Sequence, residues 1–214
     1  MLLELDGRNA NAVLRKYTWG LDLAGHNGSV NSLESAGSIG GLLAVYDTNG
    51  TPGTSAYDLS YVYLYDGNGN VGRVVDPNAA NATVAIKAKY EYDPYGARTN
   101  TPGAGEFDQL CRFSTKQFDA ETGLGYWGYR YYSPGMGRWI GRDPMGEAGG
   151  VNLTRYAANT PACALDPVGL EDRDGCCGPE IGWRLSQLIQ QFEATFNHLT
   201  PQRNSWPRHC AWRM

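Results

Sequence analysis

Long apolar runs and clusters of basic charge are both missing from this sequence of 214 residues. No apolar run approaches the roughly 18 residues that a membrane-spanning helix requires. Lys and Arg number 18 against 22 acidic residues, which gives a net charge of −4 and no basic cluster. The first twenty residues carry charges through the stretch that is apolar in a signal peptide. The sequence therefore predicts no membrane span, no nucleic-acid partner and no cleavable export signal.

Cysteine is scarce and irregularly spaced. Five cysteines are an odd count, whereas a disulfide framework usually shows an even set in a shorter secreted chain. Cys111 and Cys163 are expected to be small buried apolar residues. Near the C-terminus, a zinc site, a disulfide from the last cysteine to one of the adjacent pair, and free thiols remain alternatives, although the adjacent pair lacks the C-x2-C spacing of zinc sites. These candidate residues are Cys176, Cys177, His198, His209 and Cys210. No metal or cofactor is predicted.

Helical periodicity is restricted to one stretch near the C-terminus. Apolar residues recur there on a single helical stripe, and Pro179 and Pro201 suit its start and its end. The stripe consists of Leu185, Leu188, Ile189, Phe192, Phe196 and Leu199. The sequence predicts one short C-terminal helix and little helix before it.

Glycine, proline and aromatic residues are plentiful instead. The 28 glycines and 11 prolines make up about 18% of the chain, against about 12% in average proteins. With 14 tyrosines and 6 tryptophans, this composition favours a turn-rich, mainly β protein. A polar, Gly-rich stretch at residues 29–41 is expected to be a surface loop.

Residues 1–105 contain a degenerate repeat in which an aromatic strand runs into an Asp- or Asn-containing turn. The positive φ that tight hairpins need is supplied by Asn-Gly and Asp-Gly pairs. The copies are residues 5–11, 45–50, 63–71 and 90–96. The tyrosine spacing is uneven, so the repeat predicts antiparallel hairpins of variable length joined in one winding sheet. Asp66 to Asn70 partly matches a calcium loop, but the Gly and the acid required later are absent, and a hairpin turn suffices.

Residues 106–170 close with two Asp-Pro-x-Gly units, Asp143-Pro144-Met145-Gly146 and Asp166-Pro167-Val168-Gly169. Taken alone, each unit is a turn signature. Together with residues 118–124, Tyr129-Arg130-Tyr131-Tyr132 and 137–140, they resemble the Rhs-repeat-associated core, and the hairpin copies before them resemble the YD repeat. Residues 149–161 also fit the family pattern, except that Thr154 replaces the usual aromatic residue. The resemblance implies a partial Rhs shell over residues 1–105, the core over 106–170 and a variable tail with one helix over 171–214.

The resemblance also implies chemistry. In Rhs-core proteins the two units flank a self-cleavage machinery that cuts after the Leu that closes the second unit. Carried over, the bond is Leu170–Glu171, the carboxylates are Asp143 and Asp166, and Arg142 is the neighbouring charge that keeps one of them ionised. No turnover enzyme is predicted.

The implied role is a toxin shell that encapsulates and releases its own tail. Its expected partners are the tail as cargo, an immunity protein, and upstream repeats or a second copy of the chain, because the repeats begin uncapped and leave an exposed sheet edge. The same resemblance implies an exported or cell-surface protein and a C-terminal piece of a longer chain. The alternative is a non-cleaving surface or adhesive scaffold whose aromatic strands bind carbohydrate or protein.

Overall fold

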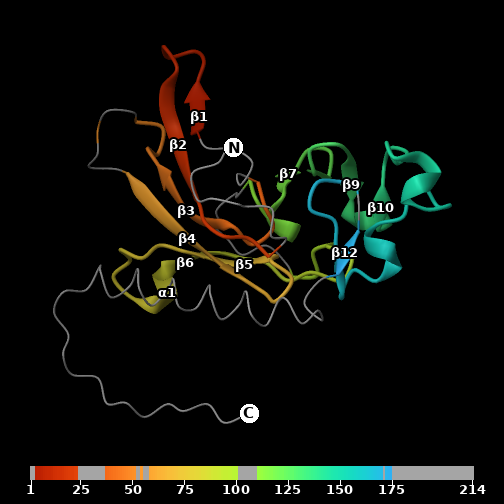
Figure 1. Ribbon diagram of the computed structural model, residues 1–214. Helices are drawn as coiled ribbons and strands as arrows, with labels where there is room; N and C mark the ends of the chain where they lie inside the picture. Colours follow the sequence, from red (N-terminus) through yellow and green to blue (C-terminus); the bar gives the residue numbers. More distant parts are fainter. Residues whose placement is uncertain are drawn as a thin grey trace, which may run out of the picture. The chain divides into compact units, whose positions relative to one another are not determined.

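The computed structural model describes residues 3–23, 37–51, 54, 58–100, 110–170 and 172–174 (Figure 1). Residues 1–178 form one compact unit and residues 179–214 a second one, and only the first contains described residues. The predicted helix over 185–199 and the cysteines and histidines of the tail lie outside them. Within the described ranges the protein is mainly β, as predicted, and no helix is long and apolar enough to cross a membrane.

Six strands form an antiparallel sheet in which sequence order and spatial order coincide (Figure 1). Each strand pairs antiparallel with the next strand in sequence, as the predicted winding sheet requires. A single α-helix of four residues, α1 (Ala82–Ala85), lies between the last two strands in the described part of the chain. The strands are β1 (Leu3–Asp6), β2 (Ala12–Trp19), β3 (Leu42–Asp47), β4 (Leu59–Tyr65), β5 (Val71–Val75) and β6 (Ile86–Lys89).

Alternation along these strands builds the first core. On β4, Tyr61 and Tyr63 are buried and Leu64 is exposed, which is the period of two expected of a half-buried strand. The buried face collects aromatic and aliphatic residues from β2 to β6. Cys111 is buried in this core, as predicted. Cys163 is exposed, so its predicted burial is wrong, because it lies in a turn at residues 161–163.

A second sheet of four short antiparallel strands has the order β10-β9-β8-β7. It borders a cluster of five rings, whose members are Phe113, Trp127, Tyr132, Trp139 and Tyr156. The ring centroids of Tyr132 and Tyr156 are 4.2 Å apart, and the Trp127 and Trp139 rings meet edge to face at 5.5 Å. The strands are β7 (Gln117–Asp119), β8 (Leu124–Tyr126), β9 (Tyr131–Ser133) and β10 (Arg138–Trp139); a two-stranded ladder, β11 (Ala164–Leu165) with β12 (Arg173–Asp174), follows.

Aspartate side chains close many of the turns in the part of the chain that the structure describes. In eight of them the Oδ1 atom of an Asp accepts the backbone N–H two residues later, at 2.8–3.2 Å. This contact satisfies a donor that the strand ladder leaves open, and the chain reverses within a few residues. The eight residues are Asp6, Asp47, Asp66, Asp76, Asp93, Asp119, Asp143 and Asp166.

The end of the predicted surface loop at 29–41 is buried. Ile39 is fully buried and Ser38 nearly so, and a Cβ atom on Gly69 would lie 2.6 Å from the Ile39 side chain. The expectation of a surface loop is therefore wrong for these two residues. Ile39 packs on the turn between β4 and β5. The predicted boundaries at residues 105 and 170 stay predictions.

Asp66 accepts two backbone N–H groups and the side-chain amide of Asn70, which is itself buried. We expect Asp66→Ala to lower the free energy of unfolding by about 1–3 kcal/mol, because it leaves these donors without an acceptor. Asp66→Asn keeps the acceptor and should lose less. Urea unfolding of both variants beside Asp6→Ala, whose Asp accepts a single backbone N–H through its side chain, provides the measurement. Equal losses for Asp66→Ala and Asp6→Ala would contradict this account of the turns.

Candidate functional site

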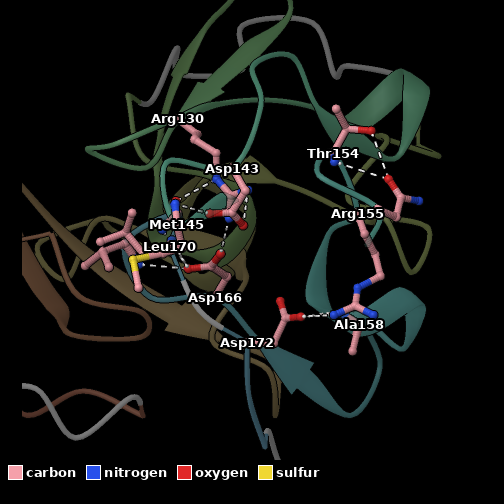
Figure 2. A network of polar contacts seen from close by, with 12 residues as sticks. Arg130, Asp143, Met145, Thr154, Arg155, Ala158, Asp166, Leu170 and Asp172 are labelled. Atoms are coloured by element: carbon pink, nitrogen blue, oxygen red, sulfur yellow. Dashed lines mark hydrogen bonds and ion pairs between the residues drawn. The ribbon is translucent and has the colours of Figure 1, made fainter. Parts of the chain in front are cut away.

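The second Asp-Pro-x-Gly unit folds back on its own carboxylate. Asp166 follows β11 and is fully buried. Its Oδ1 atom accepts the backbone N–H groups of Val168, Gly169 and Leu170 at 3.2, 2.6 and 3.1 Å. The loop from 166 to 170 is therefore organised around a single carboxylate oxygen, and the predicted cleavage residue Leu170 lies at its end (Figure 2).

The first unit makes a similar but more exposed turn after β10. Asp143 Oδ1 accepts the N–H of Met145 at 2.8 Å, and the Asp143 carbonyl accepts the N–H of Gly146 at 3.0 Å. Gly149 lies against this carboxyl group, because a Cβ atom there would stand 2.8 Å from Oδ2. Both Asp-Pro-x-Gly units are thus turns, as their residues indicate.

A buried arginine joins the two carboxylates. Arg130 donates from Nη1 to Asp143 Oδ2 at 2.9 Å and from Nη2 to Asp166 Oδ2 at 3.1 Å (Figure 2). Its Nε atom donates to the Gly169 carbonyl at 2.6 Å, and its guanidinium lies over the Trp139 ring at 4.3 Å. The fork of one guanidinium therefore brings together the two aspartates that lie 23 residues apart in sequence, and holds the loop before Leu170.

Arg142, the cation expected from the sequence, is exposed, and among the described residues it forms no ion pair with either aspartate. The structure places Arg130 between them instead. The sequence contains a signal for this residue: in Tyr129-Arg130-Tyr131-Tyr132, the first and third residues are exposed and the second and fourth are buried. Alternation along a strand puts Arg130 on the same face as Tyr132.

Burial and hydrogen bonding act in opposite directions on the proton affinity of Asp166. Burial raises the pKa of the Asp166 carboxyl above the usual value for aspartate, while the N–H groups of Gly169 and Leu170 and the Arg130 guanidinium act to lower it. Burial is the largest of these effects. Asp166 therefore holds a proton more readily than an exposed aspartate does.

The chain just after the predicted bond is held as well. Glu171 lies outside the described residues, but Asp172 Oδ2 accepts from Arg155 Nη2 at 3.2 Å and from the Ala158 N–H at 2.9 Å (Figure 2). The next two residues form β12, which pairs with β11. Contacts on both sides therefore fix the ends of the segment that contains the Leu170–Glu171 bond.

No protein-family model matches the sequence. Toxin subunit YenC2 of Yersinia entomophaga is 40% identical over 87 residues, which cover 39% of this chain and 9% of that protein. Toxin protein Tse5 of Pseudomonas aeruginosa is 48% identical over 69 residues, which cover 32% of this chain and 5% of Tse5. Among solved structures, a chain of the Photorhabdus luminescens Tc holotoxin pore matches with a TM-score of 0.50 and 30% identity over 64% of this chain and 6% of that one.

The homologues are thus Tc-toxin and Rhs-type toxin proteins, in agreement with the resemblance seen in the sequence. The chain spans less than a tenth of the length of each of these three proteins. The assignment of residues 106–170 to the Rhs-repeat-associated core stays a prediction.

We expect Arg130→Met to destabilise the fold by about 3–5 kcal/mol near neutral pH, because it leaves the Asp166 carboxylate buried without its cation. The loss should depend on pH. A carboxyl whose folded pKa is raised contributes stability that is complete below its unfolded pKa and is lost as the pH rises through the folded pKa. Removal of Arg130 raises that pKa further, so the deficit should shrink toward about pH 4. Urea unfolding across this pH range measures it.

Arg142→Met is the matched control. The same substitution on an exposed arginine should leave the unfolding free energy within about 0.5 kcal/mol of the parent at each pH. An Arg130→Met deficit that stays constant with pH would show that the lost packing on Trp139 dominates and not the ion pairs.

Proposed function

We propose that this chain, whose homologues are Tc-toxin and Rhs-type proteins, is the part of a polymorphic toxin shell that contains a self-cleavage site. Cleavage of the Leu170–Glu171 bond would separate the shell from a variable tail, residues 171–214, which is its cargo. The observation that carries the proposal is Arg130, which binds Asp143, Asp166 and the Gly169 carbonyl at once. This arrangement draws two carboxyl groups toward the peptide that precedes the bond.

Peptide hydrolysis requires one group that accepts a proton from water and one that donates a proton to the leaving amine. Asp166, whose pKa is raised by burial, is the proposed acid. Asp143, whose side chain is less deeply buried, is the proposed base. Water adds to the Leu170 carbonyl carbon and gives a proton to Asp143; the bond to the Glu171 nitrogen breaks as that nitrogen takes the proton of Asp166. Arg130 contacts neither reacting atom, so we assign it a positioning role.

Cleavage need not release the tail at once. The contacts of Asp172 with Arg155 and Ala158, and the pairing of β12 with β11, connect residues beyond the bond to residues before it. These contacts do not involve the bond itself. We therefore infer that the two fragments stay associated until a further event separates them.

The wider biology is part of the same proposal. A toxin shell requires export or display at the cell surface, and a toxic tail requires an immunity protein in the producing cell. The repeats of the six-stranded sheet would continue into upstream repeats or pair with a second copy through the edge of β1, which among the described strands pairs only with β2.

A second candidate is a non-cleaving surface or adhesive scaffold. One observation favours it: Asp143 and Asp166 make the same Asp-closed turn as six other aspartates for which no chemistry is proposed. Exposed rings are also present on the second sheet, where Tyr126 and Tyr131 lie with centroids 5.0 Å apart and Tyr129 is exposed beside them. Such rings offer a stacking surface for a carbohydrate.

The intact mass of the purified chain separates the two candidates. Self-cleavage predicts fragments of residues 1–170 and 171–214 that co-elute under native conditions and separate under denaturing ones. Asp143→Asn and Asp166→Asn keep the turn acceptor Oδ1 and remove the acid–base function, so each should slow cleavage at least about a hundredfold. The double variant should be no slower than either single one, as expected of groups that act as a unit.

Arg142→Ala tests the expectation drawn from the sequence and should slow cleavage far less than Arg130→Met. A chain that keeps the full mass of 214 residues after long incubation would contradict self-cleavage and support the scaffold. Binding of the same chain to immobilised polysaccharides, lost on replacement of Tyr126 and Tyr131 by Ala, would then establish the second candidate.

A further inference from the structure

A second buried cation contacts the loop before Leu170. Lys116 has an exposed fraction of only 6%, and its Nζ atom donates to the carbonyls of Gly37 and Pro167, each at 2.6 Å. Gly37 precedes β3 of the six-stranded sheet, and Pro167 lies in the loop organised by Asp166. The lysine therefore connects the N-terminal half of the described chain to the proposed cleavage loop.

Lys116 extends from a turn that is itself fixed on that sheet. Ser114 and Thr115 are both buried with positive φ, and each makes a contact with the turn between β4 and β5. The N–H of Ser114 donates to Asn70 Oδ1 at 2.8 Å, and the hydroxyl of Thr115 donates to the Gly69 carbonyl at 2.7 Å. The same hydroxyl accepts the N–H of Gly40 at 2.7 Å. The position of Lys116 thus depends on the folded sheet.

Three consecutive peptide groups before Leu170 are held at both ends. The carbonyls of Pro167, Val168 and Gly169 accept from Lys116 Nζ, the Tyr129 N–H and Arg130 Nε. The N–H groups of Val168, Gly169 and Leu170 all donate to Asp166 Oδ1. Because successive peptide planes are linked only through φ and ψ, fixing these three restricts the direction of the next one, which contains the Leu170 carbonyl.

Stability alone does not account for a lysine at this position. Burial of an ammonium group costs free energy. Proteins in which apolar side chains of similar volume replace buried charges are often as stable or more stable. A charged donor does form a stronger and more directional hydrogen bond to a carbonyl than a neutral one. The benefit of Lys116 is therefore in the geometry of the loop that it binds.

We propose that Lys116 is a positioning residue for cleavage after Leu170, and that it makes cleavage conditional on a folded six-stranded sheet. The proposal rests on the proposed function. The ammonium group transmits the docking of the turn at 113–115 to the Pro167 carbonyl, so that an unfolded or undocked sheet leaves the loop without its cleavage geometry. This dependence on Lys116 would prevent the release of the tail from a shell that has not folded completely.

Lys116→Met in the full-length chain removes the donor and keeps a side chain of similar length. We expect cleavage to slow about ten- to a hundredfold, the effect of losing one charge-assisted hydrogen bond that holds the reactive geometry. The urea midpoint should change little, because removal of the buried charge offsets the loss of the donor to the Gly37 and Pro167 carbonyls. Amide hydrogen exchange at Gly169 and Leu170 should become faster. The matched control, Lys87→Met, removes a lysine of β6 that pairs with Asp76 and should change none of the three.

The pH profile supplies a readout that a purely structural role would not move. Burial lowers the pKa of Lys116 to about 8, although Asp166 opposes the shift; Cys111 and Asp22 are the other titratable groups that act on it. Burial raises the pKa of the Cys111 thiol to about 12, so that thiol stays neutral when Lys116 titrates. Loss of the Asp166 proton slows cleavage with rising pH in the parent and in Lys116→Met alike. The parent should show a further decline as the pH rises through about 8, and Lys116→Met should lose this alkaline step.

The alkaline decline cannot come from unfolding caused by Lys116. Its folded pKa lies below the unfolded value, so deprotonation relieves the cost of the buried charge and the folding stability contributed by this group increases with pH. A cleavage rate of Lys116→Met equal to that of the parent would overturn the proposal. So would slow cleavage with a lower urea midpoint and unchanged exchange, which would make Lys116 a residue of the fold only. A parent chain that never cleaves refutes the proposed function instead, and the exchange measurement then decides by itself whether Lys116 orders the loop.

Discussion

Backbone N–H groups at the ends of short strands need acceptors, and in this chain the carboxylate of an aspartate supplies them. The strands are two to eight residues long, so a large share of the backbone lies in turns that no ladder can satisfy. Eight aspartates meet this demand from within the turn itself. A sheet made of many short hairpins is stable in such a protein because each reversal of the chain is locally complete.

The candidate site is built from the same turn with one addition. Oδ1 of Asp143 and of Asp166 closes the turn, which leaves Oδ2 of each residue available for a second partner. Arg130 takes both, from the position that precedes β9, with its guanidinium over the Trp139 ring. The Asp-closed turn thereby becomes part of a buried charge network, and burial raises the pKa of Asp166. The two turns differ from the other six because a buried arginine contacts both of their carboxylates.

Local patterns predicted the parts of the structure that depend on neighbours in sequence. The hairpin copies gave the turns at Asp66 and Asp93, and aromatic alternation gave the β class. Asp143 and Asp166 were paired only through the family resemblance, since a separation of 23 residues contains no distance information. The sequence places Arg142 beside the aspartates because it is the neighbour of Asp143 in the chain, whereas the cation that contacts both carboxylates in the structure is Arg130. The contacts of Lys116 with Gly37 and Pro167 span 79 and 51 residues, and no local pattern can predict them. Burial of Ile39 and exposure of Cys163 were likewise decided by tertiary packing.

The self-contained turn has a consequence for how such proteins can change length over time. A hairpin whose turn satisfies its own polar groups needs only an adjacent strand with which to pair. Duplication or deletion of one such unit would leave the side-chain contacts of the other Asp-closed turns in place. The turn at 113–115 is different, because it contacts Asn70, Gly69 and Gly40 together. A change in the number of hairpins should therefore cost little stability on the N-terminal side of Gly37. Between Gly37 and the ring cluster it would disrupt the contacts of the turn at 113–115.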